Sequence, residues 1–202
     1  MIQRGSRHRV SEEFHGVLMF IGLLWVVYIA SWLVPSILTY GVRPGTLPGL
    51  IGVLTMPFLH AGIGHLLSNT IPLAVLLALL AGSRANSVAI VVSIVLVNGL
   101  LLWAFSLQRD ANHVGASGLV YGLVSFLILS GFLEWRPLSL LVSVIVLVCF
   151  GLSTSTWGGM LPRQGISWDG HLFGAIAGGL VAYALTREGT REKTRGRGDQ
   201  NS

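Results

Sequence analysis

Three sets of polar residues in this 202-residue chain could carry out chemistry, and each lies inside or beside a strongly apolar stretch. They are His60, His65 and Asn69, then Ser117 within a Gly-Ala-Ser-Gly sequence, and finally His171. Polar side chains at membrane depth are costly, so their clustering needs a reason. A serine hydroxyl becomes an effective nucleophile when a neighbouring base takes its proton, and histidine is the commonest base. Ser117 and His171 therefore predict attack on a carbonyl group by the serine.

Donors for the resulting oxyanion lie near the same sequences. Ser117 is expected to begin a helix, where backbone N–H groups are unpaired and can stabilise negative charge. His65 and Asn69 are four residues apart, hence on one helical face, and both can donate. Asp169 lies only two residues before His171 and would not face it on a continuous helix. A Ser–His dyad is therefore the simpler interpretation.

The composition indicates that most of the chain does not face water. Hydrophobic residues make up 52% and charged residues 10% of the sequence, and the mean hydropathy is +0.73. A soluble domain has about 25% charged residues, and a membrane-spanning helix needs about 20 apolar residues. Six apolar stretches can be distinguished, which run approximately over Val17–Val34, His65–Ser83, Val88–Leu107, Gly118–Leu133, Leu138–Leu152 and His171–Leu185.

These stretches predict an all-α membrane protein of the six-transmembrane-helix type. The bundle would occupy residues 14–186, between a cytoplasmic N-terminal tail (residues 1–13) and a disordered, basic cytoplasmic tail (residues 187–202). The expected tails follow from their charged and polar composition.

Lysine and arginine are distributed unequally between the two sides of such a bundle. With six spans both termini lie on one side, and cytoplasmic segments are enriched in basic residues. The other side would hold three basic residues, Arg43, Arg109 and Arg163, against ten on the side of the termini, which are Arg4, Arg7, Arg9, Arg84, Arg136, Arg187, Arg191, Lys193, Arg195 and Arg197. We therefore predict a multi-pass protein of the cell membrane with cytoplasmic termini. A nucleic acid partner is not expected from this placement of positive charge.

The same topology places the polar residues together at the outer face, where spans two, four and six all begin. His65, Ser117 and His171 lie near the starts of these three spans. Ser117 precedes Glu134 by 17 residues and His171 precedes Arg187 by 16 residues, which corresponds to about 25 Å and about 24 Å of helix. The serine and the second histidine should therefore lie at nearly equal depth.

Small residues on spans four and six predict a close contact between these two helices. Span four carries Gly118 and Gly122, and span six carries Gly174 and Gly178. Small residues at every fourth position allow helix backbones to approach closely in lipid. This contact would bring the serine and the histidine within reach of each other.

The polar sequences occur in the order His60-x4-His65-x3-Asn69, Gly115-Ala116-Ser117-Gly118-x2-Tyr121-Gly122, and His171 with its glycine-rich face. Together they resemble the rhomboid family of intramembrane serine proteases, and the resemblance covers spans two to six. The family implies cleavage of transmembrane segments of other membrane proteins near their outer end. It also implies that the reaction takes place in the lipid bilayer and needs neither metal nor cofactor.

The resemblance further implies a role for each matching residue. The roles are nucleophile for Ser117, general base for His171, oxyanion donors for His65 and Asn69, and packing against the His171 ring for Tyr121. Gly115 and His60 would shape the site, although His60 could equally cap its helix.

Other positions carry weaker expectations. Many rhomboids have a Trp-Arg pair in a long first outer loop, whereas this loop, approximately Pro35–Pro57, contains Arg43 but no tryptophan. Asn112 and His113 are expected to lie in a solvated loop. Cys149 is expected to be an inert, buried side chain.

Two other functions fit parts of this pattern. A catalytically inactive rhomboid-like protein that binds membrane clients would share the fold, but such proteins usually lack the serine or the histidine, and this chain has both Ser117 and His171. A small transporter or channel with a histidine proton path would place polar residues through the full membrane depth. Here the inner halves of spans two, four and six are almost wholly apolar. These patterns specify neither a substrate sequence nor an oligomeric state.

Overall fold

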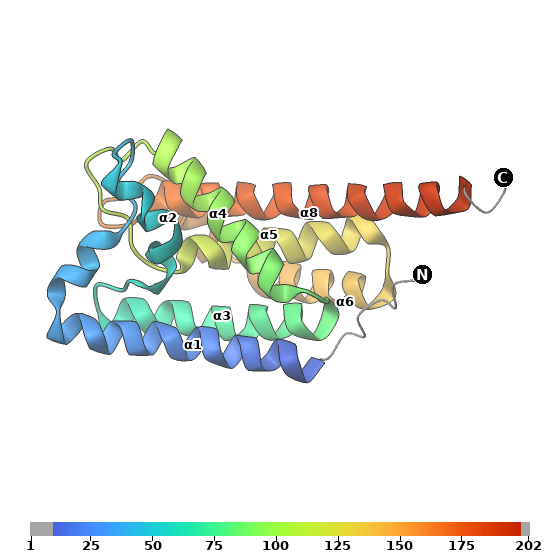
Figure 1. Cartoon of the computed structure of the whole chain (residues 1–202), viewed down its shortest axis with the longest axis horizontal. Helices are drawn as coiled ribbons and strands as arrows, with labels where there is room; N and C mark the ends of the chain where they lie inside the picture. Colours follow the sequence, from blue (N-terminus) through green and yellow to red (C-terminus); the bar gives the residue numbers. More distant parts are fainter. Residues whose placement is uncertain (1–9, 199–202) are drawn as a thin grey trace.

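The computed structural model describes residues 10–198, with the side chains of residues 11–187, and their regular structure is helical (Figure 1). The long helices are α1 (Val10–Leu33), α3 (Ile63–Ser83), α4 (Ser87–Phe105), α5 (Ser117–Glu134), α6 (Pro137–Val146) and α8 (Trp168–Gly198). The shorter elements are η1 (Pro35–Tyr40), η2 (Pro48–Leu50), α2 (Gly52–Thr55), η3 (Met56–Phe58), the π-helical turn η4 (Leu147–Gly151) and α7 (Thr154–Gly158). The prediction of an all-helical protein is thereby confirmed.

Five of the six predicted apolar stretches fall on long helices, and the other, Leu138–Leu152, falls on α6 and η4. Among the described residues, four helices, α1, α3, α4 and α5, are long and apolar enough to cross a membrane. α6 and η4 together form a shorter apolar helix over Pro137–Gly151. α8 carries its apolar residues in its first half, before Arg187. The protein is therefore a multi-pass membrane protein, and the count of six spans stays a prediction.

The helix ends differ from the predicted domain boundaries at both ends of the chain. α1 begins at Val10, so it includes residues 10–13 of the predicted N-terminal tail. Residues 1–9 of that tail lie outside the described residues. α8 continues to Gly198, whereas the sequence predicts a disordered tail over residues 187–202. The segment after Leu185 contains no proline, and its arginine, glutamate and lysine residues have high helix propensity, which explains the continuation.

α5 lies at the centre of the bundle and packs against α8, α6, α4 and α3, while α1 packs mainly on α3 (Figure 1). The shared core contains large aliphatic and aromatic side chains from α3 and α5, among them Leu73, Leu76, Leu80, Leu123 and Phe126. Many large apolar side chains on the periphery are exposed, for example Leu18, Met19 and Val88. A soluble protein would bury such a surface, whereas a bilayer covers it with hydrocarbon.

α3, α5 and α8 all begin at the same end of the bundle, which we call the site end. At the opposite end Arg84, which follows α3, forms an ion pair with Glu134, the last residue of α5. Glu13 of α1 also lies at this opposite end, where it accepts hydrogen bonds from the N–H groups of Asn86 and Ser87 before and at the start of α4. Consecutive long helices therefore run in alternating directions.

The loop between α1 and α3 folds over the site end of α4. The Trp103 indole of α4 donates to the Thr46 carbonyl over 2.8 Å, and the Gly45 N–H donates to the Trp103 carbonyl over 2.9 Å. Val42 forms an isolated antiparallel bridge with His113, with N–O distances of 2.9 and 3.0 Å. This loop has no tryptophan of its own, and Trp103 of α4 binds it through a hydrogen bond.

Glycines allow α5 and α8 to lie directly against each other. A Cβ atom on Gly174 would collide with the carbonyl oxygen of Gly118, and one on Gly178 would collide with the carbonyl oxygen of Gly122. The structure therefore places the four glycines of spans four and six on one backbone-to-backbone contact, as small residues permit in lipid.

Candidate active site

Ser117 and His171 lie within hydrogen-bond distance at the site end. Ser117 is the first residue of α5, and its Oγ is 2.8 Å from His171 Nε2 in the first turns of α8. The other ring nitrogen, Nδ1, is 2.7 Å from the Gly159 carbonyl oxygen. Because a carbonyl only accepts, we assign the ring proton to Nδ1. This tautomer leaves Nε2 free to accept the proton of the serine hydroxyl.

The His171 ring is held by Tyr121 on one face. The two rings are stacked, with centroids 4.5 Å apart and an interplanar angle of 10°. The Tyr121 hydroxyl donates to the Thr156 carbonyl over 2.9 Å. A Cβ atom on Gly159 would collide with the Tyr121 hydroxyl. The segment around α7 therefore holds both rings through backbone carbonyls, and neither Gly159 nor Thr156 was identified from the sequence.

His65 and Asn69 of α3 approach Ser117 from another side. Gly115 has a φ of +117°, which a side chain rarely adopts, and a Cβ there would lie 2.6 Å from the His65 ring. The Asn69 amide, which is 3% exposed, donates to the His65 carbonyl over 3.1 Å. Gly115 thus lets the loop before α5 pass directly over the His65 imidazole.

His60 lies in the connection before α3 and behind His65. The two imidazole rings are in edge contact, with centroids 5.1 Å apart and an interplanar angle of 66°. His60 is 1% exposed, and neither ring nitrogen forms a well-aligned hydrogen bond with a described residue. Burial, and secondarily the neighbouring His65, lower the pKa of His60 from 6.5 to about 4. His60 is therefore a neutral ring that packs behind the site near neutral pH.

Two cavities meet at Ser117. The first, of about 680 Å³, is lined by polar as well as apolar residues, and its polar residues include Gln108, Asn112 and His113. The second, of about 470 Å³, lies between α3, α5 and the η4–α7 segment and is lined by apolar as well as polar residues. Both cavities share three residues, which are Ser68, Asn69 and Ser117. The Ser117 hydroxyl is therefore accessible from two directions.

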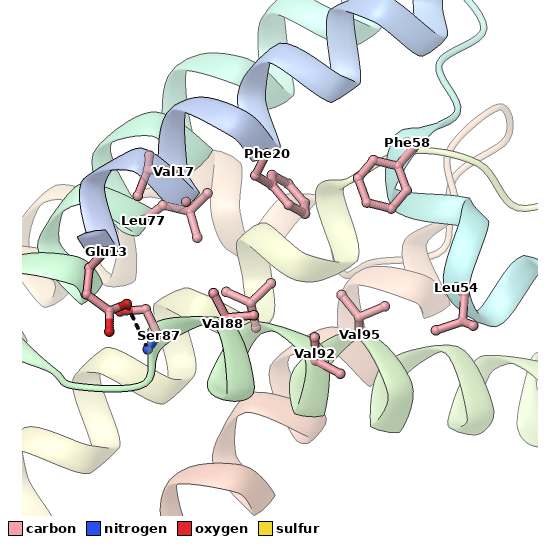
Figure 2. A pocket seen from close by; sticks show the side chains of 12 residues that line it. Glu13, Val17, Phe20, Leu54, Phe58, Leu77, Ser87, Val88, Val92 and Val95 are labelled. Carbon is pink, nitrogen blue, oxygen red and sulfur yellow. Dashed lines mark hydrogen bonds between the residues drawn. The ribbon is translucent and has the colours of Figure 1, made fainter. Parts of the chain in front are cut away.

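A third cavity, of about 210 Å³, lies between α1 and α4 (Figure 2). Figure 2 shows Val88, Val92 and Val95 of α4 across from Phe20 and Phe58, and the Glu13 carboxylate bonded to Ser87 at one end of the cavity. Among the described residues, its lining includes neither Ser117 nor any histidine. This cavity is therefore separate from the site.

Two positions differ from what the sequence predicts. His113 is 2% exposed rather than solvated, because the first loop pairs with it through Val42, whereas its neighbour Asn112 is exposed as expected. Burial lowers the pKa of His113, and the charge of Asp169 acts in the opposite direction. Cys149 is exposed on η4 and lines the second cavity rather than being buried.

The remaining candidate residues occupy one site. Ser117, His171, His65 and Asn69 line the first cavity, while the others lie against them: Tyr121, Gly115 and His60. Asp169 does not contact the His171 ring, and its carboxylate instead accepts a hydrogen bond from the Ser106 hydroxyl. The arrangement thus contains a serine, a base with a suitable tautomer and a group of nearby donors.

Comparison with known proteins shows the family of this chain. Residues 47–188, more than half of the chain, match the family model described as the rhomboid domain. An uncharacterized protein of Mycobacterium bovis is 36% identical over 181 residues, which cover 84% of this chain and 74% of that protein. An uncharacterized protein of Mycobacterium leprae is 31% identical over 176 residues, covering 84% and 70%. Rhomboid-related protein 1 of Caenorhabditis elegans is 29% identical over 136 residues, covering 63% and 38%. The chain therefore belongs to the rhomboid family.

Proposed function

We propose that this protein is an intramembrane serine endopeptidase that cleaves transmembrane segments of other membrane proteins. The observation that carries the proposal is the 2.8 Å contact between Ser117 Oγ and His171 Nε2, together with the bond from Nδ1 to the Gly159 carbonyl. A properly protonated base at this distance is what activates a serine for attack on an amide carbonyl.

The reaction proceeds in two stages. His171 Nε2 takes the proton of the Ser117 hydroxyl as Oγ attacks the substrate carbonyl carbon. The tetrahedral intermediate then collapses, the imidazolium gives its proton to the leaving amine, and an acyl-serine remains. Water, deprotonated by the same imidazole, hydrolyses the acyl-serine and regenerates Ser117.

Donors for the oxyanion surround the serine. The side chains of His65 and Asn69 line the cavity at Ser117, and the backbone N–H groups of the first turn of α5 are unpaired within their helix. Such donors, fixed before the substrate binds, stabilise the charge that develops in the transition state. The close approach of the His65 ring over Gly115 supports this role.

The two cavities support a substrate that lies in the membrane. The second cavity opens beside Pro72 of α3 and Phe150 of η4, so an apolar segment can approach Ser117 between these elements. The first cavity, whose lining includes Gln108 and Asn112, offers a path for the water that the second stage consumes.

The topology proposed for the membrane is six spans with both termini in the cytoplasm. The alternating directions of the long helices support it, as does the excess of basic residues in the sequence segments expected on the side of the termini. In this orientation Ser117 lies within the cell membrane near its outer face, and cleavage takes place near the outer end of the substrate segment.

The test uses the purified full chain in liposomes with a model transmembrane substrate. We expect cleavage by the wild type and none by Ser117→Ala or His171→Ala, and labelling of the wild type alone by a fluorophosphonate. Ser93→Ala is the matched control, because the Ser93 hydroxyl donates to the Ala89 carbonyl within α4. We expect this variant to cleave at the wild-type rate. A Ser117→Ala variant that cleaves at the wild-type rate contradicts the proposal. Binding of the substrate without cleavage by the wild type would instead indicate an inactive, client-binding rhomboid.

A further inference from the structure

A second polar network lies buried at the site end, next to the dyad but not part of it. The Ser106 hydroxyl donates to Asp169 Oδ2 over 2.6 Å and lies 3.3 Å from His113 Nε2. His113 Nδ1 is 2.6 Å from Ser167 Oγ. The exposed fractions of Ser106, Asp169 and His113 are 0%, 1% and 2%. Three of these four polar side chains are thus removed almost entirely from solvent, and the fourth, Ser167, is half-buried.

The Asp169 carboxylate accepts hydrogen bonds from residues that follow α4 and from the first turn of α8. Besides the Ser106 hydroxyl, Oδ2 accepts from the Leu107 N–H over 3.1 Å, and Oδ1 accepts from the Gly170 N–H over 3.0 Å. Asp169 lies in the first turn of α8, where the helix dipole favours a negative charge. A buried carboxylate is tolerated only when it is satisfied in this way. The carboxylate therefore fixes the end of α4 to the start of α8.

The network connects the two segments that carry the dyad. His113 precedes Ser117 by four residues, and its backbone is fixed on its other side by the bridge to Val42. Ser167 precedes His171 by four residues, and its carbonyl accepts the His171 N–H over 3.1 Å. Contacts of His113 with Ser106 and Ser167 therefore hold the loop before Ser117 against the turn that leads into His171.

We propose that His113 and Asp169, joined through Ser106, are positioning residues that set the separation of Ser117 and His171. The inference rests on the proposed protease function. The glycine contact between Gly118 and Gly174 fixes the two helices on one side of the dyad, and the buried network fixes the preceding segments on the other. The dyad lies between these two points of attachment. Asp169 does not touch the imidazole, so its effect reaches the reaction only through geometry.

The test compares single substitutions in the full-length protein in liposomes. Ser106→Ala removes one oxygen atom from the middle of the network. We expect its kcat to fall about tenfold or more, with KM within about twofold of wild type, because a misplacement of about 1 Å costs about 100-fold in rate. The rate of fluorophosphonate labelling should fall in parallel. Asp169→Asn, which keeps an acceptor oxygen, should retain more activity than Asp169→Ala.

Ser143→Ala is the matched control for Ser106→Ala. Ser143 is also 0% exposed and donates to the Leu127 carbonyl over 2.6 Å, but at the contact between α5 and α6. We expect this variant to lower the melting temperature while kcat per folded molecule stays at the wild-type value. If Asp169→Ala does not fold, Ser106→Ala and Asp169→Asn decide the question.

The outcomes separate this inference from the proposed function. If the wild type cleaves, Ser117→Ala does not, and both Ser106→Ala and Asp169→Asn keep the wild-type kcat, the positioning role is wrong and the protease assignment stands. If Ser106→Ala loses activity only in proportion to its loss of folded protein, as in the control, the network is structural and the inference is again wrong. A wild type that neither cleaves substrate nor reacts with the fluorophosphonate contradicts the proposed function and this inference with it.

Discussion

The ring of Tyr121 lies parallel to the imidazole of His171, with the ring centroids 4.5 Å apart. Tyr121 follows Ser117 by about one turn of α5. One helix therefore supplies both the hydroxyl group and the aromatic surface that fixes the base beside it. The Tyr121 hydroxyl in turn donates a hydrogen bond to the Thr156 carbonyl.

The Tyr121 ring should matter more than its hydroxyl. Tyr121→Ala removes a stacked contact worth about 0.5–1.5 kcal/mol beyond its buried area and frees the imidazole to rotate, so we expect kcat to fall about tenfold or more. Tyr121→Phe keeps the stack and loses one hydrogen bond of about 1 kcal/mol, so its kcat should fall no more than about fivefold. Steady-state cleavage of a transmembrane substrate measures both. Equal rates for the alanine variant and the wild type would rule out this role.

Asn69→Ala should slow cleavage without abolishing it. Removal of one oxyanion donor costs about 10²–10³ in kcat, and backbone donors at the start of α5 remain. His65→Ala should lose at least as much, because its ring lies against Gly115 beside Ser117.

Ser68→Ala is the control for Asn69→Ala. Ser68 is the next residue on α3, lines the same two cavities and also donates to the His65 carbonyl, over 2.9 Å. It should keep nearly the wild-type kcat. If Ser68→Ala and Asn69→Ala lose the same activity, the common bond to His65 explains the loss, and Asn69 is not an oxyanion donor.

Gly174→Ala should lower both stability and activity. The added Cβ would collide with the Gly118 carbonyl and push α8 away from α5, which carries His171 away from Ser117. Gly82→Ala is the matched control, since nothing lies within 4 Å of a Cβ at this position of α3. It should be neutral or more stable by about 0.5–1 kcal/mol, because alanine favours helix. The measurements are thermal unfolding in detergent and cleavage of the same substrate. A Gly174→Ala variant as stable and active as wild type would mean that α5 and α8 do not meet through this face.

Local sequence patterns were sufficient to place the main helices and the dyad. Apolar length locates each helix, and the alternating directions then bring the starts of α3, α5 and α8 to one end, with Ser117 near His171. The glycines of spans four and six could be placed at a contact because small residues have that use in lipid.

Contacts between distant segments could not be predicted in this way. His113 is buried because Val42, 71 residues earlier, pairs with it, and no local pattern encodes that bridge. The Gly159 carbonyl binds His171 from an irregular segment that has no apolar periodicity. Cys149 lies in an apolar run but on a π-helical turn, where it is exposed, and the apolar composition of the run does not indicate this turn.

The ion pair at the opposite end should contribute to stability without affecting catalysis. Arg84 bonds to Glu134 and, over 2.8 Å, to Ser130, and the side chains of the pair are only 11% and 18% exposed. Arg84→Ala leaves a nearly buried carboxylate without this partner, so we expect a loss of about 3 kcal/mol. Arg136→Ala is the control, because Arg136 is 68% exposed and 3.9 Å from Glu134, which predicts a loss of about 0–1 kcal/mol. Unfolding of both variants tests this difference. Equal losses would contradict it.

Acid should destabilise the fold through His60. Burial lowers its pKa from 6.5 to about 4, so the unfolded chain takes up a proton as the pH falls through 6.5 while the folded protein keeps the ring neutral. The unfolded state then binds more protons, and the free energy of unfolding decreases as the pH falls between these two values. The full effect over this interval is about 3 kcal/mol. Above pH 6.5 both states hold a neutral His60, and no contribution is expected there.

His60→Gln should make the protein less sensitive to acid, because glutamine does not titrate. We expect the difference in melting temperature between pH 7 and pH 4.5 to be smaller for this variant than for the wild type. The two proteins are compared by this difference in melting temperature, because burial also lowers the pKa of His113. His113 is present in both proteins, so its contribution is common to both differences. His15→Gln, at an exposed position near the start of α1, is the matched control for replacing a histidine by glutamine. If His60→Gln and the wild type lose the same stability on acidification, the His60 ring takes up its proton equally in the folded and unfolded states, and its neutral packing behind His65 is wrong.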